Sequence, residues 1–214
     1  MDCDTAYRLP QAGTTWSHEL EIKRSRFLTY IRRVSDERSA RAFLDEVRAQ
    51  HPTARHHCSA YIYHVPAAQP VERSSDDGEP SGTAGRPMLE QLRGSGMLDI
   101  AAVVVRYFGG IKLGAGGLVH AYSNSVGETL PLVAQVERAR QEIYTVELSH
   151  SDAGRHLAEV RQRGISLLDV SYAAQVTATL GCVPGGRPQL DAALAAITGG
   201  KARLQAAGED WVER

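Results

Sequence analysis

Residues 103–117 read VVVRYFGGIKLGAGG, an apolar run that opens into a glycine-rich segment. The six residues before Arg106 are all apolar, and a short β-branched run of this kind is typical of a strand buried on both faces. Five glycines from Gly109 to Gly117 allow positive φ and let a partner come close to the main chain. We expect a helix to begin near Leu118 and to direct its unpaired N–H groups at this glycine-rich loop. The stretch therefore predicts a strand, a loop and a helix that together can receive an anion.

The glycine-rich loop does not match the two common nucleotide motifs. Gly114 is followed by Ala115 rather than by the Lys-Ser/Thr pair of a Walker A loop, and residues 114–119 lack the last glycine of the dinucleotide fingerprint. Arg106 and Lys112 still supply positive charge beside the loop. These residues therefore predict that the loop binds an anion, but they do not indicate that the anion is a nucleotide.

Residues 74–87, SSDDGEPSGTAGRP, form the second unusual stretch. Ser81 and Thr83 are suitable caps and Pro87 suits a first helical turn, so we expect a loop that enters a helix. A calcium-binding loop would need a distant glutamate, which is absent. Residues 76–85, the acidic loop, carry three carboxylates: Asp76, Asp77 and Glu79.

Together these two stretches closely resemble the signature of the IMPACT family, including its bacterial YigZ-type members. The resemblance extends to other short motifs, and in all it covers roughly residues 15–138. At position 120 the chain has His where many relatives have Arg, which weakens this position as a permanent cation. The matching segments are residues 75–85, 105–114 and 116–122, with KRSRF at 23–27, HP at 51–52 and HCSAY at 57–61.

The resemblance implies a fold and a function. The first domain is expected to share the α+β fold of the second domain of ribosomal protein S5. Eukaryotic IMPACT proteins are regulators that restrain activation of a starvation-responsive kinase of a translation initiation factor by competing for its activator. For a YigZ-type member, the resemblance implies a non-enzymatic, translation-associated regulatory protein whose partner is RNA, the ribosome or a translation-related protein.

In this interpretation the two loops make one binding surface, on which Tyr107 and Phe108 offer stacking surface for bases. Alternatively, both aromatic residues belong to the core and the glycines only make tight turns. The expected anion- or RNA-binding residues are Arg86, Arg106, Tyr107, Phe108, Gly109, Gly110, Lys112, Gly114, Gly116 and Gly117. The expected residues of the acidic loop are Asp76, Asp77, Gly78, Glu79, Ser81 and Thr83.

Two other interpretations of the loops stay open. The chain can be an enzyme, or a metal- or nucleotide-binding protein, that acts on a phosphorylated small molecule or a peptide-like substrate, with Mg²⁺ on the acidic loop and phosphate on the glycine-rich loop. No nucleophile–base pair or metal-ligand spacing supports an enzyme, so we expect no catalytic residue, resident metal or cofactor. In the third interpretation, the acidic loop is a structural clasp across the glycine-rich loop.

Composition limits the partners. The 214-residue chain has 24 basic and 25 acidic residues and a net charge of −1, so RNA must be bound by a local patch, and nothing indicates DNA. Cys3, Cys58 and Cys182 are odd in number and far apart, which fits a reducing cytoplasm. Neither a signal peptide nor an apolar run near 18 residues is present, so we expect no membrane partner.

The pattern of apolar residues predicts an α+β chain with two domains. We expect residues 1–14 to be a flexible leader and residues 15–138 to form the first domain. In this domain we expect the helices to lie on one side of a sheet, and residues 66–75 to be a linker. Residues 141–214 form a small second domain. Its order of strand, helix, two strands, helix and strand indicates a ferredoxin-like fold.

Overall fold

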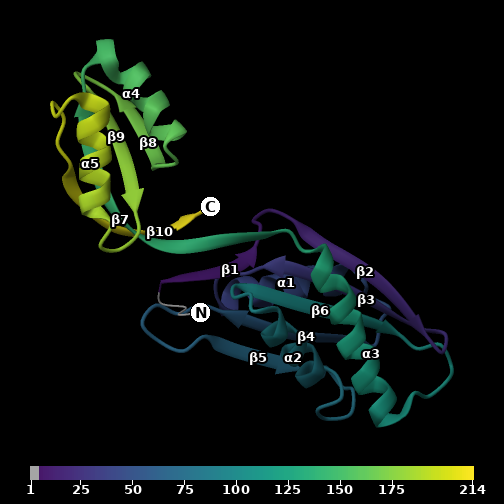
Figure 1. The fold of residues 1–214 in the computed structure, drawn as a ribbon. Coiled ribbons are helices and arrows are strands. Elements are labelled where there is room, and N and C mark those ends of the chain that lie inside the picture. Colours follow the sequence, from purple (N-terminus) through teal and green to yellow (C-terminus); the bar gives the residue numbers. More distant parts are fainter. Residues whose placement is uncertain (1–4) are drawn as a thin grey trace. The chain divides into compact units, whose positions relative to one another are not determined.

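The computed structural model describes residues 5–214 and divides them into two compact units (Figure 1). Tyr7–Glu137 form the first unit, and residues 5–6 with Arg138–Arg214 form the second. Both units combine helices and strands, which confirms the α+β class. None of the helices within residues 5–214 is both long enough and apolar enough to span a bilayer.

The first unit is built on a five-stranded sheet in which every neighbouring pair is antiparallel. The central strand β6 (Ile100–Tyr107) is the predicted apolar run, and seven of its eight residues are buried. The strand order is β2 (Thr15–Ile22), β3 (Ser25–Arg33), β6, β4 (His56–Tyr63) and β5 (Val71–Ser75).

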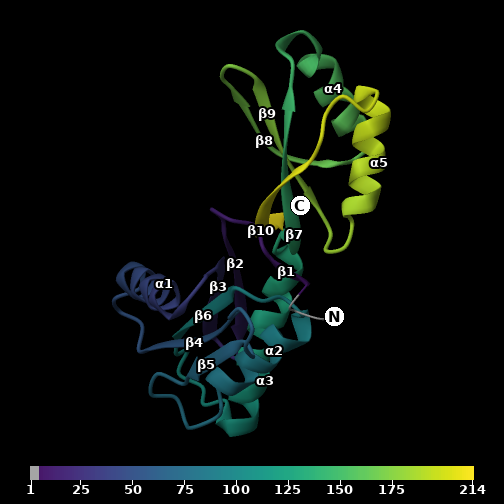
Figure 2. The ribbon, with the colours of Figure 1, turned by 90° about the vertical axis from the view of Figure 1, so that its left-hand side faces the viewer.

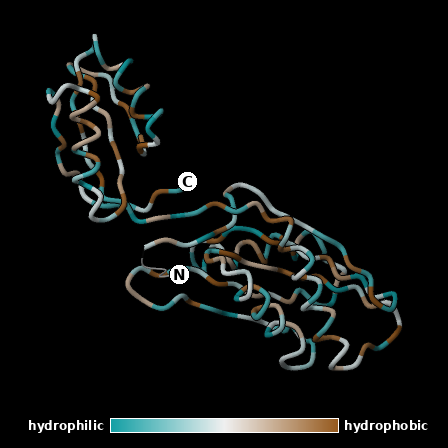
Figure 3. The backbone as a smooth tube through the Cα atoms, in the orientation of Figure 1, coloured by the Kyte–Doolittle hydropathy of each residue, from teal (hydrophilic) through white to brown (hydrophobic). Residues whose placement is uncertain are grey.

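Helices cover both faces of this sheet (Figure 2). Helix α1 (Glu37–Gln50) packs its Phe43 and Val47 against the odd-numbered residues of β6, whereas α2 (Gly85–Ser95) and α3 (Gly114–Thr129) pack against the even-numbered ones. The prediction that β6 is buried on both faces is therefore confirmed. The prediction that the helices lie on one side is wrong, because α1 supplies a second apolar stripe. Figure 3 shows this pattern as hydrophobic positions recurring along the strands and helices.

Three predicted boundaries of the first unit are also wrong. Residues 6–10 of the predicted leader form strand β1 (Ala6–Pro10), because Tyr7 and Leu9 are apolar and buried; residues 1–4 lie outside the described part. The predicted linker contains β5, which pairs with β4. Helix α3 begins at Gly114 rather than near Leu118, so three of the five glycines belong to the helix.

The second unit has the predicted order of elements. Helices α4 and α5 bury Leu157, Val160 and Leu194 against Val146 and Leu180 of the sheet. Strand β7 begins at Gln135, earlier than predicted, and pairs with β1, β9 and β10. The elements are β7 (Gln135–Leu148), α4 (His150–Gln162), β8 (Ser166–Tyr172), β9 (Val176–Cys182), α5 (Arg187–Thr198) and β10 (Gln205–Glu213), with strand order β10-β7-β9-β8.

Antiparallel pairing brings the two loops to the same end of the first sheet. Tyr107, at the end of β6, pairs with Arg26 near the start of β3, and Arg106 pairs with His56 at the start of β4. Strand β5 ends at Ser75, opposite Ser59, and so enters the acidic loop at this same end. We call it the loop end of the sheet.

The acidic loop is closed by Asp76. One carboxylate oxygen accepts hydrogen bonds from the backbone N–H groups of Ala84 (3.0 Å) and Gly85 (2.8 Å), and the other accepts from Gly82 (2.8 Å). Burial favours the neutral acid, but the three donors outweigh it and hold the pKa of Asp76 below its usual value. Asp76 therefore accepts hydrogen bonds from two N–H groups at the start of α2 that have no partner within the helix, because the N-cap residue Ala84 has no side-chain acceptor.

Gly109 is required by close packing. A Cβ atom on Gly109 would lie 1.9 Å from the carbonyl oxygen of Arg24, in the turn between β2 and β3. The Gly109 N–H also donates to Ser25 Oγ at 3.3 Å. The turn between β2 and β3 is thus packed directly on the loop that follows β6.

We expect Asp76→Asn to lower the free energy of unfolding by about 1–2 kcal/mol at neutral pH, since the partly exposed carboxylate is screened. The folded pKa is lowered, so the contribution of ionised Asp76 is complete above the unfolded pKa of about 3.9 and is lost as the pH falls through the folded value. Urea denaturation at several pH values should show the gap to wild type closing below about pH 4. Asp169→Asn, on an exposed strand position, is the control, and a gap that persists in acid would contradict the assignment.

We expect Gly109→Ala to destabilise the protein by about 1–3 kcal/mol, because the new Cβ must displace the Arg24 backbone. Gly116→Ala is the matched control, since its Cβ would meet nothing within 4 Å and the residue lies in α3. The control should be neutral or stabilising by up to about 1 kcal/mol. Thermal melts that place both variants at the same midpoint would refute the packing role of Gly109.

Candidate functional site

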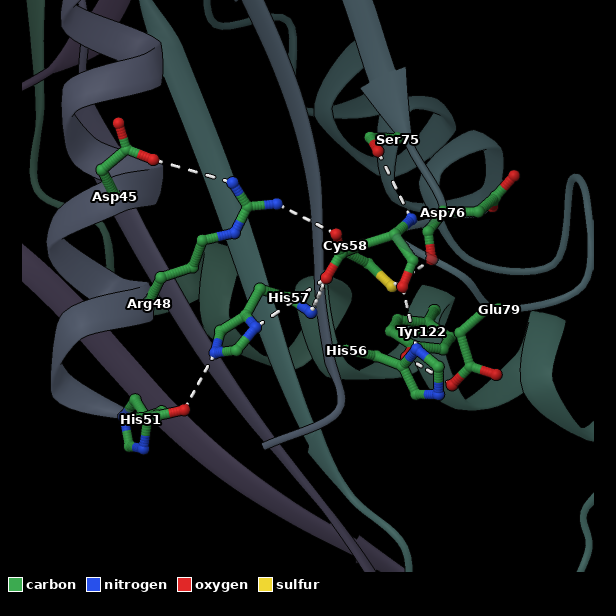
Figure 4. Close-up of polar contacts among 11 residues, drawn as sticks. Asp45, Arg48, His51, His56, His57, Cys58, Ser75, Asp76, Glu79 and Tyr122 are labelled. Atoms are coloured by element: carbon green, nitrogen blue, oxygen red, sulfur yellow. Dashed lines mark hydrogen bonds and ion pairs between the residues drawn. The ribbon is translucent and has the colours of Figure 1, made fainter. Parts of the chain in front are cut away.

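A buried ion pair joins the acidic loop to the end of β6. Arg106 Nη1 donates to Glu79 Oε1 at 2.6 Å, and the Tyr122 hydroxyl donates to the same oxygen at 2.8 Å. The side chains of Arg106 and Glu79 are only 8% and 4% exposed. Figure 4 shows Tyr122 beside Glu79. Burial strongly raises the pKa of Tyr122, so its hydroxyl stays a donor. The prediction that Arg106 is a cation for a ligand needs correction, because Glu79 already neutralises its charge.

Arg106 also orders the aromatic residues beside it. Its guanidinium carbon lies 5.5 Å from the ring centre of Phe27 and 5.7 Å from that of Phe108. Its Nε is buried and has no hydrogen-bond partner among residues 5–214. Phe108 is 52% exposed, so one part of its ring contacts Arg106 while a large part faces solvent.

Asp77 ties the acidic loop to α1 and β4. Its carboxylate accepts from Arg48 Nη2 at 2.9 Å and from the backbone N–H of His57 at 2.6 Å. Its own carbonyl oxygen accepts from His56 Nδ1 at 2.8 Å, and its φ of +43° is in the left-handed region. Figure 4 shows Arg48 reaching from α1 toward this network, with His56 and His57 on β4.

The three carboxylates of the acidic loop do not form a metal site. Asp76 binds backbone N–H groups, Asp77 binds Arg48 and β4, and Glu79 binds Arg106 and Tyr122. Within residues 5–214, no three His, Cys, Asp or Glu side chains are grouped so that they can hold a metal ion. The interpretation in which Mg²⁺ binds the acidic loop is therefore wrong, because each carboxylate already has a different protein partner.

Cys58 and the histidines near it are structural as well. The Cys58 thiol donates to the carbonyl oxygen of Asp76 at 3.0 Å, and burial raises its pKa to about 12. His57 lies on the other face of β4, where its Nε2 bonds the His51 carbonyl oxygen at 3.1 Å. His57 and Cys58 therefore point to opposite faces of the sheet.

A cavity of about 320 Å³ lies between the two loops at the loop end of the sheet. Glu79 and Pro80 of the acidic loop, Phe108 and Lys112 of the β6–α3 loop (residues 108–113), and Arg55 and His56 at the start of β4 all line it. The first residues of α3, Gly114 and Ala115, line it too. The loops thus converge on one opening.

Two cations of this cavity have no acidic partner in the described part of the chain. Arg55 and Lys112 are exposed, and neither forms an ion pair or a side-chain hydrogen bond in the part of the chain that the structure describes. Sequence reasoning missed Arg55 and His56. Their position at the start of a strand antiparallel to β6 is the signal that would have placed them beside the loop after Arg106.

Several predicted site residues lie away from this cavity. Arg86 lines a separate hollow of about 400 Å³ between α2 and α3. Tyr107 points to the opposite face of the sheet, because strand residues alternate, and its hydroxyl bonds His51 Nδ1 at 3.0 Å. Thr83 is buried, and its hydroxyl donates to the Pro80 carbonyl. Of these residues, none can join Lys112 around one ligand.

The remaining predicted residues have local backbone roles. Gly78 and Gly110 both have positive φ, and Gly109 packs on Arg24. Ser81 is exposed in the acidic loop, and Gly116 and Gly117 lie in the first turn of α3.

Tyr30, His51 and Tyr107 form a short chain of hydrogen bonds. The Tyr30 hydroxyl lies 2.7 Å from His51 Nε2, on the ring side opposite to Tyr107. Burial, followed by the nearby His57 and Arg26, lowers the pKa of His51. A neutral His51 accepts from one tyrosine and donates to the other, which fixes α1 against the sheet.

Comparison with known proteins matches both parts of the chain. The Impact N-terminal domain family matches residues 23–130, and a domain of unknown function, DUF1949, matches residues 146–201. IMPACT family member YvyE of Bacillus subtilis is 43% identical over 170 residues, which is 79% of this chain and 76% of that protein. IMPACT family member YigZ of Escherichia coli is 48% identical over 130 residues, or 61% and 64% of the two chains.

Among solved structures, a crystal structure of a hypothetical protein is 37% identical, with a TM-score of 0.62 over 94% of this chain and 97% of that one. The structure of the two-domain translational regulator Yih1 is 27% identical over 57% of this chain and 48% of that one. Its TM-score of 0.40 is too low to bear on the fold or function of this chain. From the domain matches and the identity to YvyE, this chain belongs to the IMPACT family.

Proposed function

We propose that this chain is a non-enzymatic regulatory protein that acts in translation by binding RNA phosphate in the cavity between its two loops. The observation that carries this proposal is a pair of exposed cations, Arg55 and Lys112, which have no ion pair within residues 5–214 and line one cavity with the start of α3. Membership of the IMPACT family supports the link to translation. The partner is then RNA, free or in the ribosome, and the site of action is the cytoplasm.

The start of α3 suits an anion. The first-turn N–H groups of a helix have no intrahelical partner, and the N-cap Leu113 provides no side-chain acceptor for them. No acidic residue lies in the first turn of α3, and Gly114 and Gly116 leave the backbone uncovered. The helix dipole favours negative charge at this point. A phosphate group there would lie on the same cavity as Arg55 and Lys112.

Phe108 gives the cavity a surface for a base. Its ring is half exposed and makes a cation–π contact with the Arg106 guanidinium. Stacking of a base on an aromatic ring stabilises single-stranded RNA binding by about 1–3 kcal/mol. In this proposal Arg106 and Glu79 position Phe108 and the acidic loop, and Arg55 and Lys112 bind phosphate.

The proposed fold assignments agree with this role. The strand order β10-β7-β9-β8 with two helices supports a ferredoxin-like second unit. Likeness of the first unit to the second domain of ribosomal protein S5 rests on the family resemblance alone. A function drawn from either fold is an analogy, so the proposal depends on the cavity.

A phosphorylated small molecule is the second candidate ligand. The volume of about 320 Å³ is in the range of small-molecule sites, and the same cations would bind its phosphate. Isothermal titration with nucleoside phosphates, without Mg²⁺, separates the two candidates. Tight binding of a mononucleotide with no gain for longer RNA would favour the small molecule.

We expect Arg55→Ala with Lys112→Ala to weaken binding of single-stranded RNA at least about tenfold at low salt. The slope of log affinity against log salt should fall by roughly 1.4, since each phosphate contact on a single strand contributes about 0.7. Fluorescence anisotropy with labelled RNA over about 50–200 mM salt measures both quantities.

Lys201→Ala with Arg203→Ala is the matched control, because it removes the same charge from exposed positions of the second unit. Its affinity and salt slope should equal those of wild type. Absence of RNA binding by wild type at low salt, or equal loss in both double variants, would remove the proposal.

A further inference from the structure

The turn between β2 and β3 has a backbone conformation that its two residues rarely adopt. Ile22 pairs with Ser25, so Lys23 and Arg24 form a two-residue hairpin turn, and their φ angles are +47° and +64°. Two left-handed residues in such a turn are the geometry for which Asn-Gly is strongly preferred. Long side chains at both positions are therefore costly to the backbone.

The turn is held firmly beside the candidate site. Its Arg24 carbonyl packs on Gly109, and Ser25 Oγ accepts from the Gly109 N–H. Gly109 is the residue after Phe108 in the β6–α3 loop, which lines the cavity. The exposed side chains of Lys23 and Arg24 are thus at the same end of the sheet as Phe108.

The basic residues around this sheet include some that form ion pairs and some that do not. Arg26, Arg32, Arg48 and Arg106 each form an ion pair with a carboxylate: Glu19, Glu46, Asp77 and Glu79 respectively. By contrast, Lys23, Arg24, Arg55 and Lys112 have no ion pair among the residues that the structure describes. All four come from segments that meet at the loop end. Arg38, Arg73 and Arg86 likewise have no ion pair among the described residues, but they lie in α1, β5 and α2.

We propose that the Lys23–Arg24 turn is a second phosphate-binding element, and that one single strand of RNA runs from the start of α3 across Phe108 to this turn. The inference rests on the proposed function and adds the extent and the single-stranded form of the ligand. A single strand fits because a base must leave any helix to stack on the half-exposed Phe108 ring. Lys23 and Arg24 of the turn then bind two phosphates on the far side of that base.

The test separates binding from stability. Lys23→Asn with Arg24→Gly supplies the favoured turn residues and removes both charges. We expect this variant to melt at a higher temperature than wild type while its affinity for single-stranded RNA of about 12 nucleotides falls about tenfold. The salt slope should fall by roughly 1.4, as for two lost phosphate contacts.

A single nucleotide gives a second readout on the same variant. Binding of a nucleoside 5′-monophosphate, which has no phosphate beyond its base to reach the turn, should stay unchanged, and a duplex as long as the 12-nucleotide RNA should bind more weakly than the single strand. Lys201→Ala with Arg203→Ala again controls for net charge.

The results that would contradict this inference differ from those that would contradict the proposed function. If the turn variant binds the longer RNA as wild type does, or loses the nucleoside monophosphate too, the turn is not a separate contact and this inference is wrong while the cavity proposal stands. A duplex that binds as tightly as the single strand would also overturn it. If wild type binds no RNA at all, the proposed function itself fails.

Discussion

The buried pair of Glu79 and Arg106 joins the two loops on which the candidate site depends. Each charge is nearly inaccessible to water, and burying either one alone would be strongly unfavourable. The Tyr122 hydroxyl supplies a further donor to Glu79, and the rings of Phe27 and Phe108 flank the guanidinium. The pair therefore positions the acidic loop against the end of β6, and the cavity exists because that position is kept.

The Glu79–Arg106 ion pair indicates a structural role for the acidic loop. Its three carboxylates are not a ligand set for a cation, since Asp76 closes the loop, Asp77 fastens it to α1 and β4, and Glu79 docks it on Arg106. The loop is closest to the structural clasp among the three interpretations, although it clasps β6 rather than the glycines. Charge available to a ligand comes instead from basic residues that form no ion pair with a carboxylate of the described chain.

Much of the first unit could be predicted from the sequence, because burial leaves a local record in the pattern of apolar residues. The unbroken apolar run of β6, the alternation in β2 and β3, and the helical spacing of Phe43 and Val47 each identify an element without knowledge of its neighbours. The site was predicted less well. Tyr107 and Phe108 are adjacent in sequence, yet the pleat sends Tyr107 to His51 and leaves Phe108 at the cavity.

The sequence by itself determined the α+β class, the family, the type of most elements and the importance of the two loops, since these depend on local spacing and on short motifs. Only the tertiary structure decided which charges are free. Whether Arg106 meets Glu79, or Arg55 meets no acid among the residues that the structure describes, depends on antiparallel register between strands that are far apart in the chain. Coulomb interactions act through space, so the chemistry of each cation was set by its neighbours in the fold.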